Sequence, residues 1–234
     1  MVVAAGAPVL VFDLDGVLFD TEAVKLAAFR DAFAPLCGAD PGALERVAEY
    51  NAAHRGVPRE VKIRHLLAGM PGVGEDGFAE VSGRYRELLA ERLAACGPVA
   101  GVPGFLDGDW AVRYVASSAP VTEIRAHLER HGLADAFRRL FGHPCSKERA
   151  LREVTAAHPG ADLLFFGDAP ADLAAARAAG VAFAAVNPHP ALAAAAADRF
   201  ADFTGVDRAA VARLARPVRP VRAVAGGRPV RGVG

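Results

Sequence analysis

Four short, largely apolar runs constrain the fold of this 234-residue chain more than any other feature. Such runs are typical of strands that are buried on both faces, as in a parallel sheet. Helical patterns follow at residues 120–130 and 170–179, the second opening with Pro170 and stopping at Gly180. This alternation predicts an α/β fold with a doubly wound parallel sheet, whose active residues lie at the carboxyl edge. The runs cover residues 8–12, 110–116, 163–166 and 181–186.

The pattern changes between residues 20 and 97, where no strand-like run occurs. Gly and Pro separate helical stretches there, which predicts an α-helical cap domain (20–97) inserted into an α/β catalytic core (1–19 and 98–207). The Gly- and Pro-rich segment 97–104 is the expected return hinge, with a matching one near Phe19 and Asp20. The expected cap helices cover residues 22–36, 44–53, 59–68 and 77–95.

The C-terminal residues 208–234 differ from the rest of the chain in charge. They hold seven of the 27 basic residues and none of the 27 acidic ones, so the preceding body carries a net charge of −7. An acidic body argues against a nucleic-acid partner, because binding phosphates requires a clustered basic face. The tail is rich in Pro, Gly and Arg and has few large apolar residues, so we expect it to be disordered.

The cysteines and the apolar runs indicate the compartment. Cys37, Cys96 and Cys145 form neither a CxxC pair nor an even disulfide framework, which favours a reducing cytoplasm. No apolar run approaches the roughly 18 residues needed to cross a bilayer, and the first residues lack the positive region of a signal peptide. We therefore expect a cytoplasmic protein without a membrane partner.

Only three of the 27 basic residues are lysines: Lys25, Lys62 and Lys147. The excess of Arg and Ala is typical of a coding bias, under which easily exchanged lysines become arginines. The three lysines that remain are therefore informative positions.

Two aspartates follow the first apolar run, in Asp13-Leu14-Asp15-Gly16. Because side chains alternate along an extended segment, residues i and i+2 aim from one side of the strand end into the same pocket. Two carboxylates there repel each other unless a cation or a shared proton lies between them. A surface turn rich in Asp and Gly is the simpler alternative, but delivery of both carboxylates by a buried strand argues against it.

A second pair, Asp168 and Asp172, follows the run at 163–166. Asp172 falls in the first turn of a predicted helix, where the helix dipole favours a negative charge, so a structural role is its alternative. Asp13, Asp168 and the main-chain carbonyl of Asp15 would make the all-oxygen site that Mg²⁺ prefers. The sequence therefore predicts a magnesium site at this edge of the sheet.

Two further positions suit an anion. Ser117 and Ser118 end a strand just before a helix whose free amides favour negative charge, although capping that helix is an alternative for Ser118. Lys147 lies at a helix start, where the dipole disfavours a cation. A rare lysine in an unfavourable position indicates a fixed anionic partner.

The order Asp-x-Asp-Gly, Ser at a strand end, Lys, and Gly-Asp-x-x-x-Asp resembles the haloacid dehalogenase superfamily of phosphohydrolases over residues 8–187. The insert resembles the small helical cap of the phosphoglycolate phosphatase and β-phosphoglucomutase branch. The resemblance implies a Rossmann-like core, Mg²⁺ as cofactor and a small phosphorylated substrate as partner.

The resemblance also implies roles for the motif residues. Asp13 matches the nucleophile that forms an aspartyl phosphate, and Asp15 matches the general acid that then acts as base. Dehalogenases of the superfamily lack this second Asp, so Asp15 argues against carbon–halogen chemistry. The implied phosphate-binding residues are Ser117, Ser118 and Lys147, and the implied metal ligands are Asp13, Asp15, Asp168 and Asp172.

The cap is expected to set specificity through Glu22, Lys25, Arg59 and Lys62. Residues 55–66 resemble the Gly-x-x-Arg segment that meets substrate in sugar-phosphate members, and a solvated helix face is the alternative for Arg59 and Lys62. Lys25 stands where β-phosphoglucomutases usually have His, which argues against a mutase. In a second departure, the helix that the family usually has before the strand at residue 110 is expected to be shortened or lost.

The leading hypothesis is a Mg²⁺-dependent phosphatase that hydrolyses a small phosphorylated metabolite, a sugar or cyclitol phosphate, through an aspartyl-phosphate intermediate. A β-phosphoglucomutase-like phosphomutase is the alternative enzyme. A non-enzymatic partner-binding module would require a damaged motif, and every motif is intact.

Overall fold

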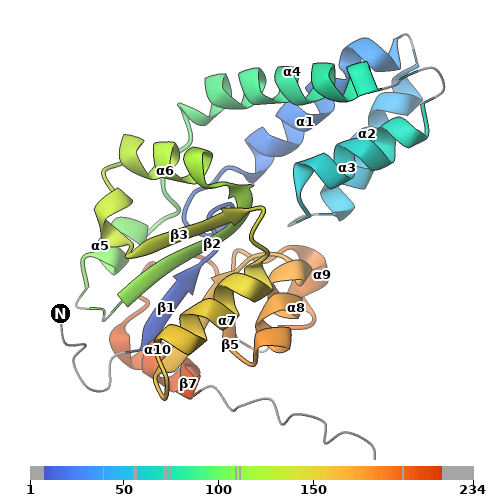
Figure 1. The fold of residues 1–234 in the computed structure, drawn as a ribbon. Helices are drawn as coiled ribbons and strands as arrows, with labels where there is room; N and C mark the ends of the chain where they lie inside the picture. The colour runs from blue at the N-terminus through green and yellow to red at the C-terminus, as the bar shows by residue number, and fades with distance from the viewer. Residues whose placement is uncertain are drawn as a thin grey trace, which may run out of the picture.

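The computed structural model describes residues 8–217 except 39, 55–56, 71–72, 74, 109, 111 and 197. A parallel sheet carries helices on both faces, and a separate group of helices stands beyond its carboxyl edge (Figure 1). The predicted doubly wound α/β core with a helical cap is therefore confirmed.

Six strands of the described chain run parallel in the order β3-β2-β1-β4-β5-β6, and β7 pairs antiparallel with β4. The four predicted runs form the interior of the sheet, whereas β3 and β6 lie at its edges and have mixed compositions. Edge strands need no continuous apolar run, which is why the sequence pattern did not mark them. The strands are β1 (Val9–Phe12), β2 (Val112–Pro120), β3 (Arg139–His143), β4 (Asp162–Gly167), β5 (Ala182–Val186), β6 (Arg199–Phe200) and β7 (Arg216–Pro217).

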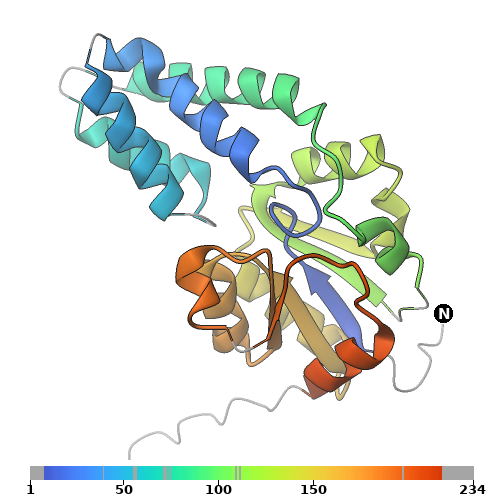
Figure 2. The ribbon, with the colours of Figure 1, turned by 180° about the vertical axis from the view of Figure 1, so that it is seen from behind.

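Helices cover both faces of the central strand β1 (Figures 1 and 2). Leu10 and Phe12 pack on the face covered by α5, α6 and α10, while Val9 and Val11 pack on the face of α7 and α8. All four side chains are fully buried, each contributing about 1.5–3 kcal/mol. The core helices are α5 (Val102–Leu106), α6 (Val121–Arg130), α7 (Lys147–Ala157), α8 (Pro170–Ala179), α9 (Pro190–Ala193) and α10 (Arg208–Leu214), with a 3-10 turn at Ala134–Ala136.

The core does not end at residue 207, so the predicted start of a disordered tail at 208 is wrong. Helix α5 has only five residues, as the sequence predicted for a shortened helix, and the C-terminal segment packs beside it. The rings of Phe105 and Phe203 lie 4.8 Å apart, and Val211 of α10 is fully buried in the same cluster. Residues up to 217 are therefore part of the core, and the remaining predicted tail, 218–234, lies outside the described residues.

The cap has its own hydrophobic core, which includes Phe29, Phe33 and Ile63. Its two connections to the sheet run side by side, because Phe19 pairs with Pro98 as an isolated bridge. None of the described helices has the length and apolar composition of a membrane span. The cap helices are α1 (Glu22–Cys37), α2 (Pro41–Ala53), α3 (Arg59–Ala68) and α4 (Glu75–Leu93).

Candidate active site

Asp13 follows β1 directly and is buried at the carboxyl edge of the sheet. Its backbone amide donates to the carbonyl of Phe166, at 2.8 Å, which continues the pairing of β1 with β4. The carboxylate accepts the amide of Leu14 at 2.8 Å, and its second oxygen lies 2.9 Å from Nζ of Lys147. Sheet pairing thus fixes the main chain of Asp13, and the Leu14 amide and Lys147 orient its carboxylate.

The charge state of Asp13 depends on its neighbours. Burial raises the pKa of Asp13 to about 7, repulsion from Asp172 and Asp15 adds to the rise, and Lys147 opposes it. A cation bound beside Asp13 would act in the same direction as Lys147, lowering the pKa of Asp13 and favouring the ionised carboxylate.

Both glycines of the acidic motifs allow close approach of the chain. Gly16 has φ +75°, and a Cβ there would lie 2.6 Å from Oδ2 of Asp168. A Cβ on Gly167 would lie 2.5 Å from Cβ of Asp172. These glycines therefore create the space in which the carboxylates sit.

Three buried carboxylates, those of Asp13, Asp168 and Asp172, each place an oxygen within 4.8 Å of the others. Asp172 also accepts the amides of Asp168 (3.2 Å) and Ala169 (3.0 Å), so its structural role at the start of α8 exists beside its place in the cluster. Clustered carboxylate oxygens are the donors that Mg²⁺ prefers. The residues present therefore fit the predicted ion.

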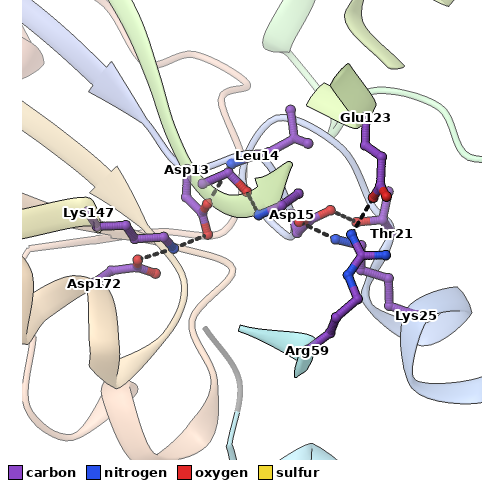
Figure 3. A network of polar contacts seen from close by, with 11 residues as sticks. Asp13, Leu14, Asp15, Thr21, Lys25, Arg59, Glu123, Lys147 and Asp172 are labelled. Carbon is purple, nitrogen blue, oxygen red and sulfur yellow. Dashed lines mark hydrogen bonds and ion pairs between the residues drawn. The ribbon is translucent and has the colours of Figure 1, made fainter. Parts of the chain in front are cut away.

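The carboxylate of Asp15 points away from this cluster (Figure 3). The hydroxyl of Thr21 donates to it at 2.6 Å, and Lys25 forms an ion pair with its other oxygen. Burial alone would raise the pKa of Asp15, but Lys25 and Thr21 hold it below the usual value. A metal contact from Asp15 would therefore come from its main-chain carbonyl, which stays a prediction.

Lys147 is the first residue of α7 and forms ion pairs with Asp13 and Asp172 (Figure 3). The helix cap is the neighbouring Ser146, whose hydroxyl accepts the amide of Arg149 at 3.2 Å. The two carboxylates raise the pKa of Lys147 although burial opposes them. Asp13 and Asp172 are therefore anionic partners of the kind expected from the position of Lys147 at the start of a helix.

The serines lie in β2, next to the acidic cluster. Ser117 is buried and its hydroxyl accepts the amide of Ala119 at 3.2 Å, while Ser118 lines a cavity that also contains Asp13 and Asp168. The N-cap residue of α6 is Pro120, so the alternative that Ser118 caps this helix is wrong.

The same cavity reaches into the cap. Glu22, Lys25, Arg59 and Lys62 all line it together with Asp13 and Asp15, so the structure brings every predicted cap residue to the candidate site. A solvated helix face, the alternative for Arg59 and Lys62, is therefore wrong.

Arg59 connects the cap to the core. Its guanidinium forms an ion pair with Glu123 at the start of α6 (Figure 3). It also lies 3.8 Å from Glu60 and 5.2 Å from the ring centre of Tyr85. Arg55 and Gly56, the first residues of the predicted cap segment, lie outside the described residues.

Comparison with known proteins agrees with this geometry. The model of the haloacid dehalogenase-like hydrolase family matches residues 8–180, three quarters of the chain. The chain belongs to this family. A phosphoglycolate phosphatase of Cereibacter sphaeroides is 31% identical over 189 residues, which cover 76% of this chain and 84% of the relative.

Solved structures share the fold of this chain. CbbY from Rhodobacter sphaeroides, in complex with phosphate, has a TM-score of 0.67 at 18% identity and covers 85% of this chain and 96% of its own. A haloacid dehalogenase-like hydrolase from Streptococcus pneumoniae has a TM-score of 0.64 at 17% identity, covering 86% of this chain and 97% of its own.

The resemblance to the phosphoglycolate phosphatase and β-phosphoglucomutase branch is thus confirmed, and this family member is an enzyme of the phosphoric monoester hydrolase type. Four residues of its site were missed. Thr21 precedes α1 and looks like a helix cap, yet it makes no capping bond. Asn51 and Tyr85 lie within helices and carry no motif, whereas Glu123 stands in the pattern Ser-Ser-Ala-Pro-x-x-Glu-Ile (117–124), which by itself gave it no role.

Proposed function

We propose that the chain is a Mg²⁺-dependent phosphatase that hydrolyses a small phosphorylated metabolite, a sugar or cyclitol phosphate, through an aspartyl-phosphate intermediate. The observation that carries the proposal is the arrangement around Asp13. A buried carboxylate with Lys147 at 2.9 Å and two further carboxylates within 4.8 Å is an aligned nucleophile beside a cation site. A stabilising role alone would not require three buried carboxylates at one edge of the sheet.

In the first step, a carboxylate oxygen of Asp13 attacks phosphorus, and the bond from phosphorus to the leaving oxygen breaks. Asp15 gives a proton to that oxygen, so it must bind a proton before this step although Lys25 and Thr21 favour its ionised form. Ser117, Ser118 and Lys147 bind the phosphoryl oxygens, and the charge of Lys147 offsets the repulsion between the carboxylate and the phosphate.

In the second step, water attacks phosphorus, Asp15 takes a proton from that water, and the bond from phosphorus to Asp13 breaks to release phosphate. The ion pair with Lys25 favours the ionised form of Asp15, which is the base that this step requires. When bound, Mg²⁺ would be held by Asp13, Asp168, Asp172 and the Asp15 carbonyl, and would neutralise charge on the phosphate oxygens.

Lys25 also supports hydrolysis over phosphoryl transfer. It stands where the resemblance places a His in mutases, and it makes an ion pair with Asp15 instead of leaving that carboxyl free. A phosphatase that acts in the cytoplasm is consistent with Cys37, Cys96 and Cys145, which are all free thiols.

The test is the release of phosphate from p-nitrophenyl phosphate with and without Mg²⁺. We expect Asp13→Asn to abolish the reaction, and EDTA to abolish it reversibly. The same assay with β-glucose 1-phosphate separates the two enzymes, since a phosphatase releases inorganic phosphate and a mutase forms glucose 6-phosphate. Retained activity in Asp13→Asn, with wild-type folding by circular dichroism, would sink the proposal.

A further inference from the structure

A second cavity, of about 240 Å³, lies between the cap helix α4 and the core helix α6 (Figure 1). Each helix lines it with residues at i, i+3, i+4 and i+7, counted from Arg86 on α4 and from Glu123 on α6. This spacing places each set on one face of its helix. None of the described residues lines both this cavity and the candidate active site, so the two are separate places in the molecule.

His127 is the buried polar side chain of this cavity. It is 3% exposed, and neither of its ring nitrogens has a hydrogen-bond partner among the described residues. Burial lowers the pKa of His127 to about 4, so near neutral pH the imidazole is uncharged and carries one N–H donor and one acceptor nitrogen. A buried polar group without a partner is unfavourable, and a ligand oxygen in the cavity would supply one.

Two arginines give the cavity a positive charge. Arg86 and Arg130 line it from opposite helices and are exposed, and within the part of the chain that the structure describes neither forms an ion pair. Glu123, the acidic residue of the lining, is already paired with Arg59. The cavity therefore favours an anionic ligand over a neutral or a cationic one.

The remaining walls of the cavity are apolar. Leu89 and Leu93 line it from α4, and the small side chains of Ala90 and Ala126 leave space between the two helices. Pockets for drug-sized ligands measure about 300–1,000 Å³, so a cavity of about 240 Å³ suits a smaller molecule. An apolar group of such a molecule would gain free energy by leaving water for these walls.

We propose that this cavity binds a small carboxylate with an apolar body, at a site separate from the candidate active site. His127 and Arg130 are neighbours on one face of α6, so a carboxylate there accepts from the imidazole N–H and from the guanidinium. The apolar body then lies against Leu89 and Leu93. Such a ligand would contact the cap and the core at once. The inference goes beyond the proposed function, because it concerns binding and not hydrolysis.

The probe for this site is 3-(4-fluorophenyl)propionate, titrated into the full chain and followed by fluorine NMR. We expect saturable binding with a Kd of about 1 mM or below, the affinity that a ligand of this size reaches. The matched amide, 3-(4-fluorophenyl)propanamide, keeps the apolar body without the charge and should bind about 10-fold more weakly. Acetate keeps the charge without the body, and should not displace the probe at the same concentration.

Variants on α6 locate the bound probe. Ala126→Trp should fill the cavity and abolish binding, and Arg130→Met should remove the preference for the carboxylate over the amide. Arg125→Met is the matched control, because it removes a positive charge from an exposed position of the same helix outside the described lining. It should leave the Kd of the probe unchanged. Circular dichroism confirms that each variant is folded.

A competition experiment separates this site from the candidate active site, which also offers cations to an anion. Saturating inorganic phosphate with Mg²⁺ should leave the probe bound, because the two cavities have different described linings. Displacement by phosphate would place the probe at the active site and overturn the inference.

Three other results would also overturn it. They are the absence of saturable binding, equal affinity for the carboxylate and the amide, and unchanged binding to a folded Ala126→Trp variant. The first two need only the wild-type protein, so they decide the matter even if Ala126→Trp does not fold. None of these measurements reads enzyme activity, so a failure here leaves the proposed phosphatase unaffected, and a failure of the phosphatase leaves this site unaffected.

Discussion

Replacing Gly16 by Ala perturbs the candidate site through one added methyl group. Gly16 follows Asp15 and has φ +75°, a conformation that costs a residue with a Cβ about 1–2 kcal/mol. The new Cβ would lie 2.6 Å from Oδ2 of Asp168, whereas ordinary van der Waals contact begins at 3.4 Å. The backbone or Asp168 must therefore move by about 0.8 Å.

The expected effect on catalysis follows from that displacement. Asp168 is buried beside Asp13 and Asp172, and a shift of this size separates the carboxylates that would hold the metal ion. A misplacement of about 1 Å in an active site can cost about 100-fold in rate. We expect Gly16→Ala to lower kcat for p-nitrophenyl phosphate by about 100-fold and to raise the Mg²⁺ concentration needed for half-maximal activity.

Gly160 provides a matched control. It has φ +77°, nearly the same backbone conformation, but no atom lies within 4 Å of where its Cβ would be. Gly160→Ala should therefore lower the free energy of unfolding by the same amount, about 1–2 kcal/mol, and keep wild-type activity. Urea unfolding measures the first quantity, and steady-state kinetics over a Mg²⁺ titration measure the second. If Gly16→Ala matches Gly160→Ala in kcat and in Mg²⁺ dependence, the close approach of Gly16 to Asp168 has no role in positioning the site.

Two further predictions concern stability. Truncation after Pro217 should leave the free energy of unfolding and turnover unchanged. Truncation after Asp207 should lower the free energy of unfolding by at least about 2 kcal/mol, because it removes the buried Val211. Equal urea midpoints for the two truncated chains would contradict a core that extends to residue 217. Burial lowers the pKa of His127 from 6.5 to about 4, so the unfolded chain binds a proton on this imidazole more readily than the folded chain does, and the free energy of unfolding should fall as pH drops from 6.5 toward 4. His127→Leu should lessen that fall, measured by urea unfolding at pH 7 and pH 5. An unchanged difference between the two pH values would refute a buried, neutral His127.

The parts of the fold that the sequence predicted are those with a local pattern. The strands at the centre of the sheet are apolar runs because both of their faces are buried, and helix α3 occupies the predicted residues 59–68. Strand β3 was missed because it lies at an edge of the sheet and mixes exposed with buried residues. The C-terminal boundary was misplaced because order there depends on contacts with α5, about 100 residues earlier in the chain.

The sequence by itself determined which charged residues gather at the sheet edge. Asp13, Lys147 and Asp168 follow strands or begin a helix, and parallel strands bring such positions together whatever the rest of the chain does. Only the tertiary structure decided how the cap residues meet that edge. It turned Asp15 toward Lys25 and placed the ammonium of Lys62 against the amide oxygen of Asn51, because these contacts depend on packing between elements that no local pattern relates.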